Sequence, residues 1–552
     1  MYILLPLGGV WAGATSCSDW DDHYDGTTGG SNNSSGTLWE QLKGNDQLTD
    51  FCDVLEQTKV FRMHKKTSVS YADLLGGGQS FTVVAPVNGT FNKDSLLQLV
   101  QTNQGDSMVE KSFVFNHISR IATSLKGDYQ IMRMLNGKNI VIQGNTIQNV
   151  SVIAANQHAR NGIIHVASKA LPYGFNLYEA LCDDPELSNI GKILRGYEWD
   201  EFDPNASVSD GVVDGVPHYV DSVVYERNRM LEAIGYIAYE DSAYWVTVPT
   251  NVGWQNAWNK VSKFFVYDTK DYAESRDSLQ RYWTMRALMD DAVFNITDQR
   301  GVNRQTMFDG QWPQVDSLVS VPWLNWRKSY VKGKPKYHVF QGPFQQGGIL
   351  DGARQLQCSN GMIFKTDVWP FTPEKTFFKE LWTEGESDWL ITQEKDLTKN
   401  SLYKSSDSIS NSAYLQILPE KNTSNWEITF RLENVLSGDY DVCAIILPQS
   451  LIDPKATNLK PCKFKADINY VEENGDAKTF NCNDTKFESD PTRVDTVLLS
   501  EAFHFPATNY ARTSDKITLT LKCSILPRET AKFSREMLLD CIYLRPRVKN
   551  NE

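Results

Sequence analysis

The feature that most constrains the fold of this 552-residue chain is a sequence pattern that occurs twice. In the first occurrence, a β-rich run within residues 80–91 breaks at a proline, and an Asn-Gly turn opens a second apolar run within residues 161–172. Residues 244–254 and 360–370 repeat these two parts in the same order. Because internal self-similarity is typical of duplicated structural units, we expect two copies of one domain.

A third segment of the first copy, residues 113–118, is an apolar run that ends close to a single histidine, His117. In this order and at this spacing, the three segments resemble a fasciclin domain. The resemblance implies an α+β fold and covers residues 38–173, and the repeat extends it to a second domain in residues 174–374. The resemblance also assigns a structural role in the fasciclin motifs to six residues: Pro86, His117, Asn161, His165, Pro249 and Asn360.

The second copy departs from the family pattern at both histidines. Phe364 replaces His165, and no histidine occurs near residues 289–292, where the counterpart of His117 is expected. A metal-binding or catalytic pair would be expected in both copies. We therefore interpret His117 and His165 as residues that hydrogen-bond inside the first domain, and Phe364 as a side chain that fills the same volume without the polar contact.

The second copy is also longer than the first. Pro249 and Asn360 are 111 positions apart, against 75 for the corresponding pair in the first copy, a difference of 36 residues. We expect this insertion between Asn295 and Gly348, where Gly, Gln, Pro and Trp are frequent. Residues 199–220 are rich in Asp, Ser and Gly and are interpreted as a separate loop.

Beyond the second copy, the spacing of apolar residues changes to the alternation of β-strands. Residues 426–432 and 440–447 are predicted strands on either side of a Ser-Gly turn. Residues 463–470 are predicted to pair with residues 477–482 across an Asn-Gly turn. No amphipathic helix of useful length competes, so residues 375–552 are predicted to form an all-β sandwich.

This sandwich resembles jelly-roll carbohydrate-binding modules in its strand–turn–strand unit and in its closing strand, residues 537–546. The resemblance implies that the domain binds a glycan. Jelly rolls host many functions, so a structural or docking sandwich remains an alternative interpretation.

An apolar segment at the N-terminus, residues 2–14, is too short to cross a bilayer of about 30 Å, for which a helix needs roughly 20 residues. Small residues and Cys17 follow it, a pattern similar to a bacterial lipoprotein signal peptide in residues 1–16 that is cleaved before a lipidated Cys17.

Residues 17–37 are predicted to form a flexible tether. Its acidic start resembles the signal that exports Bacteroidetes lipoproteins to the outer face of the outer membrane. The alternatives are an acidic linker and a buried N-terminal strand.

The sequence shows no constellation of catalytic residues, so we do not expect an enzyme. Metalloprotease, EF-hand, phosphate-loop and nucleophile-elbow motifs are absent, and no metal or cofactor is predicted. The carboxylates of Asp290 and Asp291 are interpreted as a solvated acidic face.

The net charge of −13 argues against nucleic acid as a partner. Eight cysteines remain besides Cys17, and their pairing is left open.

Tryptophans in the expected insertion are the candidate ligand-binding residues, because aromatic side chains are enriched at binding sites: Trp312, Trp323 and Trp326. The sequence therefore predicts a non-catalytic surface lipoprotein that binds a glycan, peptide or protein. The fasciclin resemblance implies an accessory role beside a SusC/SusD-like nutrient importer of the outer membrane. The alternative is an adhesin that makes cell–cell or cell–matrix contacts.

Overall fold

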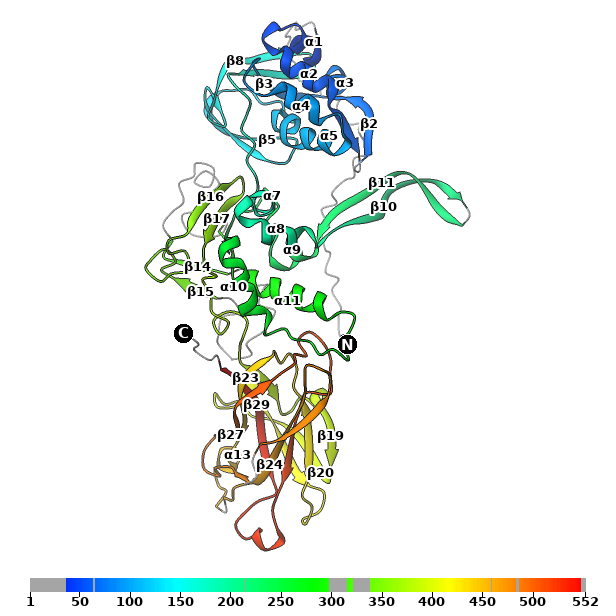
Figure 1. The fold of residues 1–552 in the computed structure, drawn as a ribbon. Coiled ribbons are helices and arrows are strands. Elements are labelled where there is room, and N and C mark those ends of the chain that lie inside the picture. The colour runs from blue at the N-terminus through cyan, green and yellow to red at the C-terminus, as the bar shows by residue number, and fades with distance from the viewer. Residues whose placement is uncertain are drawn as a thin grey trace, which may run out of the picture. The chain divides into compact units, whose positions relative to one another are not determined.

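A computed structural model describes residues 36–62, 65–213, 215–296, 315–320, 338–457, 459–482 and 486–547. The described chain forms two compact units. The first holds the chain up to Gly174 together with Glu198–Asn228, and the second holds Phe175–Tyr197 and the chain from Arg229 onward. No helix within these described residues has the length and apolar character needed to cross a membrane. The predicted fold class is confirmed, because two α+β domains precede an all-β sandwich (Figure 1).

The first domain packs helices against a seven-stranded sheet of order β4-β3-β9-β8-β7-β6-β5. Its elements are α1 (Leu38–Lys43), α2 (Thr49–Gln57), β1 (Lys59–Arg62), β2 (Lys65–Ser70), α3 (Tyr71–Gly76), β3 (Phe81–Pro86), α4 (Lys93–Leu99), α5 (Asn103–Val109), α6 (Phe115–His117), β4 (Ile118–Ser119), β5 (Gly127–Arg133), β6 (Asn139–Gly144), β7 (Thr146–Ile147), β8 (Val150–Ala159) and β9 (Gly162–Ala167). The central strands β3 and β9 run parallel, and every residue of β3 is buried, as expected for a strand covered on both faces.

The second domain repeats this arrangement around a smaller sheet of order β13-β12-β17-β16, in which β12 and β17 are parallel. Its elements are α7 (Leu177–Asp183), α8 (Ser188–Arg195), β10 (Glu198–Val213), β11 (Val216–Asn228), α9 (Arg229–Ile234), β12 (Tyr244–Pro249), α10 (Asn251–Ser262), α11 (Arg276–Met289), β13 (Val293–Asn295), β14 (Ser317–Val319), β15 (Val339–Gln341), β16 (Arg354–Cys358) and β17 (Gly361–Thr366). The same local signal starts each copy, because Thr37 caps α1 and Asn176 caps α7, each in a capping box with a glutamate three residues later.

The interpretation of residues 199–220 as a loop was wrong. This stretch lies mainly in β10, which pairs with β11 in a long antiparallel hairpin with Gly215 at its turn. Both faces of the described part of this two-stranded ribbon are largely exposed, so polar residues are tolerated on each side and the alternation that marks a half-buried strand is missing.

The third domain is a sandwich of two antiparallel sheets. Its elements are β18 (Leu381–Glu384), β19 (Ile391–Lys395), β20 (Leu397–Tyr403), β21 (Ala413–Pro419), β22 (Glu427–Arg431), β23 (Gly438–Ile446), α13 (Gln449–Ile452), β24 (Lys463–Val471), β25 (Ala477–Asn481), β26 (Phe487–Glu488), β27 (Asp495–Phe505), β28 (Thr518–Cys523) and β29 (Met537–Arg547). One sheet has the order β20-β21-β29-β23-β27 with β18 beside β29, and the other β19-β22-β28-β24-β25 with β26 beside β24. The predicted β24–β25 hairpin is confirmed, whereas β22 and β23 lie in different sheets, so the Ser-Gly turn between them is a corner between sheets.

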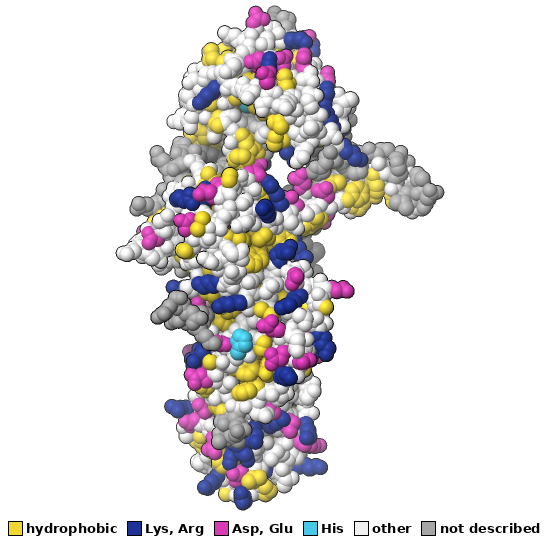
Figure 2. Space-filling model, viewed as in Figure 1, with side chains coloured by type: hydrophobic (Ala, Val, Ile, Leu, Met, Phe, Trp, Pro, Cys, Tyr) yellow, Lys and Arg dark blue, Asp and Glu magenta, His cyan; other side chains and the backbone are white. Residues whose placement is uncertain are grey.

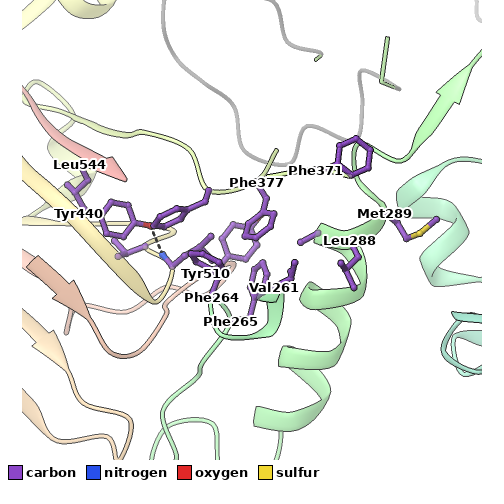
Figure 3. Close-up of a cluster of buried hydrophobic side chains, with 14 of the residues drawn as sticks. Val261, Phe264, Phe265, Leu288, Met289, Phe371, Phe377, Tyr440, Tyr510 and Leu544 are labelled. Atoms are coloured by element: carbon purple, nitrogen blue, oxygen red, sulfur yellow. Dashed lines mark hydrogen bonds between the residues drawn. The ribbon is translucent and has the colours of Figure 1, made fainter. Parts of the chain in front are cut away.

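The second domain and the sandwich share one hydrophobic core (Figure 3). The loop between α10 and α11, residues 263–275, which we call the wedge loop, carries Phe264 against Phe378 with ring centroids 4.6 Å apart. Its backbone joins the sandwich through hydrogen bonds from Ser437 N to Phe264 O, 3.0 Å, and from Thr508 N to Val266 O, 2.8 Å. These contacts make the wedge loop part of the sandwich's interior.

Candidate binding surface

Four of the residues singled out in the sequence lie outside the described residues. They are the lipidation candidate Cys17 and the ligand-binding candidates Trp312, Trp323 and Trp326. The remaining six belong to the two α+β domains.

Asn161 and Asn360 occupy equivalent buried positions just before β9 and β17. The Asn161 side-chain amide donates to the carbonyl oxygens of Leu75 and Gly77 at 3.0 and 2.9 Å, and its oxygen accepts from the backbone N–H of Leu38. Asn360 accepts from the first N–H of α7 at 2.9 Å and donates to two carbonyl oxygens. Each asparagine therefore ties the first helix of its domain to the central strand, which is a structural task.

Pro86 and Pro249 end the first central strand of each copy. Pro86 is opposite Ala167 in the parallel ladder, and Pro249 is opposite Thr366. Because proline has no N–H to continue the ladder, each marks the point where the chain leaves the sheet.

Both histidines of the first domain are completely buried and hydrogen-bonded to the backbone. His117 contacts Phe113 O through Nδ1 at 2.7 Å and accepts from the N–H of Leu171 through Nε2 at 2.9 Å. His165 contacts Thr123 O through Nε2 at 2.9 Å and accepts from the N–H of Asn156 at 3.2 Å. Burial lowers the pKa of His117 to about 4 and also lowers the pKa of His165, so both are neutral at pH 7.

Apolar residues stand at the two corresponding positions of the second domain. The ladders place Ala292 at the position of His117 and Phe364 at that of His165. Phe364 is buried and packs its ring against Trp245, with centroids 5.1 Å apart. The second copy thus fills the space with aromatic packing and keeps no imidazole there.

The interpretation of Asp290 and Asp291 as a solvated acidic face was wrong, because both side chains are buried. Asp291 Oδ1 lies 2.7 Å from Nδ1 of His338, a residue of a later segment of the chain. Burial of a carboxylate requires such a partner. This pairing joins the end of α11 to the start of β15 and is compatible with a structural role.

In the sandwich, Glu384 and Asp540 meet at Ser410. The Ser410 hydroxyl donates to Glu384 Oε1 at 2.8 Å, and its backbone N–H donates to Asp540 Oδ1 at 3.0 Å. Burial, reinforced by the negative charge of Glu386, raises the pKa of Glu384 and of Asp540 to about 7 each. Among the described residues, no group of three or more His, Cys, Asp or Glu side chains is arranged to hold a metal ion.

The sandwich also exposes the tryptophan side chain most open to solvent in the described chain. Trp389 lies in the short turn before β19 and is 63% exposed. Arg431 braces it: the guanidinium Cζ lies 6.0 Å from the ring centre, and Nη2 donates to Trp389 O at 3.1 Å. Arg431 is itself held by Glu433 and Asp515, at 3.2 and 3.0 Å. The hydrogen bond holds the backbone of the Trp389 turn, and the exposed indole offers a flat face on which a ligand can stack.

A second exposed aromatic, Tyr403, lies at the end of β20 and is 77% exposed. Lys399, on the same face of β20, bridges to Asp388 in the Trp389 turn at 2.7 Å. Tyr403 is four residues further along the strand, which is about 13 Å. We call the surface formed by Asp388, Trp389, Lys399, Tyr403 and Arg431 the aromatic edge.

The aromatic edge combines two exposed rings with charged side chains between and beside them. Rings offer flat apolar faces, and the carboxylate, ammonium and guanidinium groups offer acceptors and donors for hydroxyl groups. Sequence reasoning missed this surface because its residues come from three separate segments, and a lone Trp in a polar stretch carries no periodic signal.

Comparison with known proteins identifies the first domain. The family model of the fasciclin domain matches residues 46–172. The chain therefore contains a fasciclin domain, as the three sequence segments predict. No curated protein matches the chain.

Solved structures give further matches at low identity. A FAS1 domain pair from the insect cell adhesion molecule fasciclin I is 12% identical, covers 61% of this chain and 96% of its own, and has a TM-score of 0.18. A family 35 carbohydrate-binding module from Clostridium thermocellum is 12% identical and covers 30% of this chain and 97% of its own, with a TM-score of 0.17. A family 22 carbohydrate-binding module from Clostridium thermocellum is 9% identical and covers 30% and 86%, with a TM-score of 0.17.

Proposed function

We propose that this protein is a non-catalytic binding protein of a bacterial cell surface, anchored by lipid at Cys17, and that its sandwich binds a glycan along the aromatic edge. The observation that carries the glycan proposal is the exposed Trp389 ring, braced by Arg431 on the same sandwich edge as Tyr403. An exposed indole beside donor and acceptor groups is suited to stack on the apolar face of a sugar ring.

The presence of two exposed rings on one edge indicates the size of the ligand. Tyr403 lies four residues along β20 from Lys399, and Lys399 contacts Asp388 beside Trp389. Two rings placed in this way suit an oligosaccharide of a few units better than a single sugar. The charged side chains of Asp388, Lys399 and Arg431 are in position to select among hydroxyl patterns. The ligand of this site is therefore an extended glycan.

A glycan array with the purified mature chain tests this proposal, followed by calorimetric titration of the best ligand. Trp389→Ala and Tyr403→Ala should each weaken binding on the order of tenfold, because each removes a stacking surface. Phe480→Ala is the matched control, since Phe480 is also an exposed aromatic of the sandwich but lies on β25. Equal loss in all three variants, or no binding to any glycan, would count against the aromatic edge.

The anchoring and the partner are tested in the native membrane. Cys17→Ser should release the protein from the membrane fraction, because the thiol carries the acyl chain. Cross-linking of intact cells should recover a SusC/SusD-like transporter if the protein is an accessory of nutrient uptake. Unchanged growth of a deletion strain on every glycan bound in vitro, with impaired attachment to cells or matrix, would instead support the adhesin alternative.

A further inference from the structure

The two α+β domains carry a hairpin at the same place in the fold, but the two hairpins differ greatly. In the first domain, β1 and β2 lie between α2 and α3 and have 4 and 6 residues. In the sequence of the second copy, β10 and β11 lie between α8 and α9 and have 16 and 13 residues, and their contacts group this hairpin with the first compact unit. Because a short hairpin closes this connection in the first domain, the extension in the second is not required by the fold.

The charge of the two hairpins also differs in sign. Residues 198–228 contain eight Asp and Glu and one Arg, a net charge of −7, against −13 for the whole chain. Residues 59–70 contain four Lys and Arg and no acidic residue. More than half of the protein's net negative charge is thus concentrated in the extended hairpin. Such a concentration attracts a cationic partner and repels nucleic acid and anionic lipid surfaces.

Exposed aromatic side chains accompany this charge near the base of the hairpin. Trp199 and Tyr225 lie on one face with Glu201, Trp199 two residues before it on β10 and Tyr225 opposite it on β11, and are 40% and 44% exposed. Phe202, on the other face, is 42% exposed. Figure 2 shows hydrophobic and acidic side chains next to one another on the described part of this ribbon. Apolar anchors surrounded by charge are typical of the centre and rim of a protein-binding surface.

The ribbon also offers backbone hydrogen-bonding groups. Within the described residues, β10 and β11 form a sheet of only two strands, so the outer edge of each is open to a third. A two-stranded ribbon is marginally stable in water, and an open edge is a template for strand addition. The acidic charge keeps such edges from pairing with each other in two copies of the protein.

We propose that the β10–β11 hairpin is the docking site for an extended, Lys- and Arg-rich segment of a partner protein, which adds as a third strand to one edge. Basic side chains of that segment face the carboxylates of Asp200, Glu201 and Glu226. Two of these also have exposed partners within this chain, Glu201 with Arg227 at 2.7 Å and Glu226 with Lys111 at 3.5 Å, and are shared with the segment's cations. The segment's apolar side chains pack on Trp199 or Phe202. This surface shares no residue with the aromatic edge, so the protein has one site for a glycan and another for a polypeptide.

Fluorescence anisotropy tests the docking site with the mature chain and a labelled ten-residue peptide of alternating Lys and Val. The triple variant Asp200→Asn, Glu201→Gln, Glu226→Gln should weaken binding on the order of tenfold. The matched control, Asp407→Asn, Glu420→Gln, Glu488→Gln, changes the net charge equally at exposed positions of the sandwich and should bind as the wild type does. A peptide with a central Pro, which cannot pair as a strand, should bind more weakly.

Replacing residues 198–228 by residues 59–70 supplies a second variant, because the first domain shows that the short hairpin fits this connection. It should keep the circular dichroism spectrum of the wild type and lose peptide binding. Equal weakening in the triple variant and its control would show that net charge alone attracts the peptide and would overturn the proposal. Equal binding of the Pro peptide would also overturn it, since strand addition would then play no part.

Discussion

The hydroxyl of Tyr267 in the wedge loop donates a hydrogen bond to the backbone carbonyl of Tyr510 in the sandwich, with the two oxygens 3.0 Å apart. Both residues are buried. The bond lies within the aromatic core that the second domain and the sandwich share. The two domains are therefore expected to unfold as one cooperative unit.

Single substitutions in the wedge loop test this cooperativity. Phe264→Ala should destabilise the second compact unit by about 3–5 kcal/mol, because it removes a buried ring from a packed core. Tyr267→Phe should cost about 1 kcal/mol, since the ring stays and only the hydroxyl bond is lost. Differential scanning calorimetry should show the transition of the second unit moving as a whole. A sandwich that melts at its wild-type temperature in Phe264→Ala would contradict a shared core.

The equivalent asparagines give a paired prediction. Asn161→Ala and Asn360→Ala each leave buried backbone carbonyls and a helix N–H without a partner, and each should cost about 2–4 kcal/mol. Asn161→Ala should lower only the unfolding temperature of the first unit, and Asn360→Ala should lower only the unfolding temperature of the second unit. The two variants serve as each other's controls, and a shift of both transitions in either one would contradict the prediction.

His117 predicts that the first unit is destabilised by acid. Its pKa is about 4 in the folded state against about 6.5 in the unfolded state, so the unfolded state binds more protons between these values. The stabilisation is fully present above pH 6.5 and falls by about 3 kcal/mol as the pH drops to 4. Urea titrations from pH 7 to 4 should show this loss, and His117→Phe should remove most of the slope. If the pH dependence of stability persists in that variant, it arises from other titrating groups.

Glu384 and Asp540 predict the opposite trend in the second unit. Both pKa values are raised to about 7 in the folded state, so the folded state holds protons that the unfolded carboxyls have already released. The stability of this unit should therefore fall as the pH rises from about 4 to 7 and level off above. The variant Glu384→Gln, Asp540→Asn keeps the shape of both side chains and should flatten this dependence in the same urea titrations. An unaltered profile would contradict the assignment.

Local sequence signals predicted the central strands of both α+β domains and the β24–β25 hairpin, because a turn and an alternating strand are encoded by neighbouring residues. Gly475 illustrates this: its positive φ of 85° serves the predicted turn. The same glycine also lies so close to the wedge loop that a Cβ would stand 2.2 Å from that of Lys270, which no local signal reveals.

The rest of the site depends on contacts between distant segments. The burial of Asp291 depends on His338, and the exposure of Trp389 depends on where Arg431 and Lys399 come to lie. The sequence also concealed the β10–β11 hairpin, since a ribbon exposed on both faces has no buried side to impose a period.

The wedge loop also constrains how this architecture can be rearranged by gene fusion. A recombination point near residue 375 would give a new protein the strands of the sandwich but leave behind the phenylalanines that complete its interior. The second domain and the sandwich are therefore expected to be kept together in gene fusions. The first domain, which has its own core, is the part that can be exchanged.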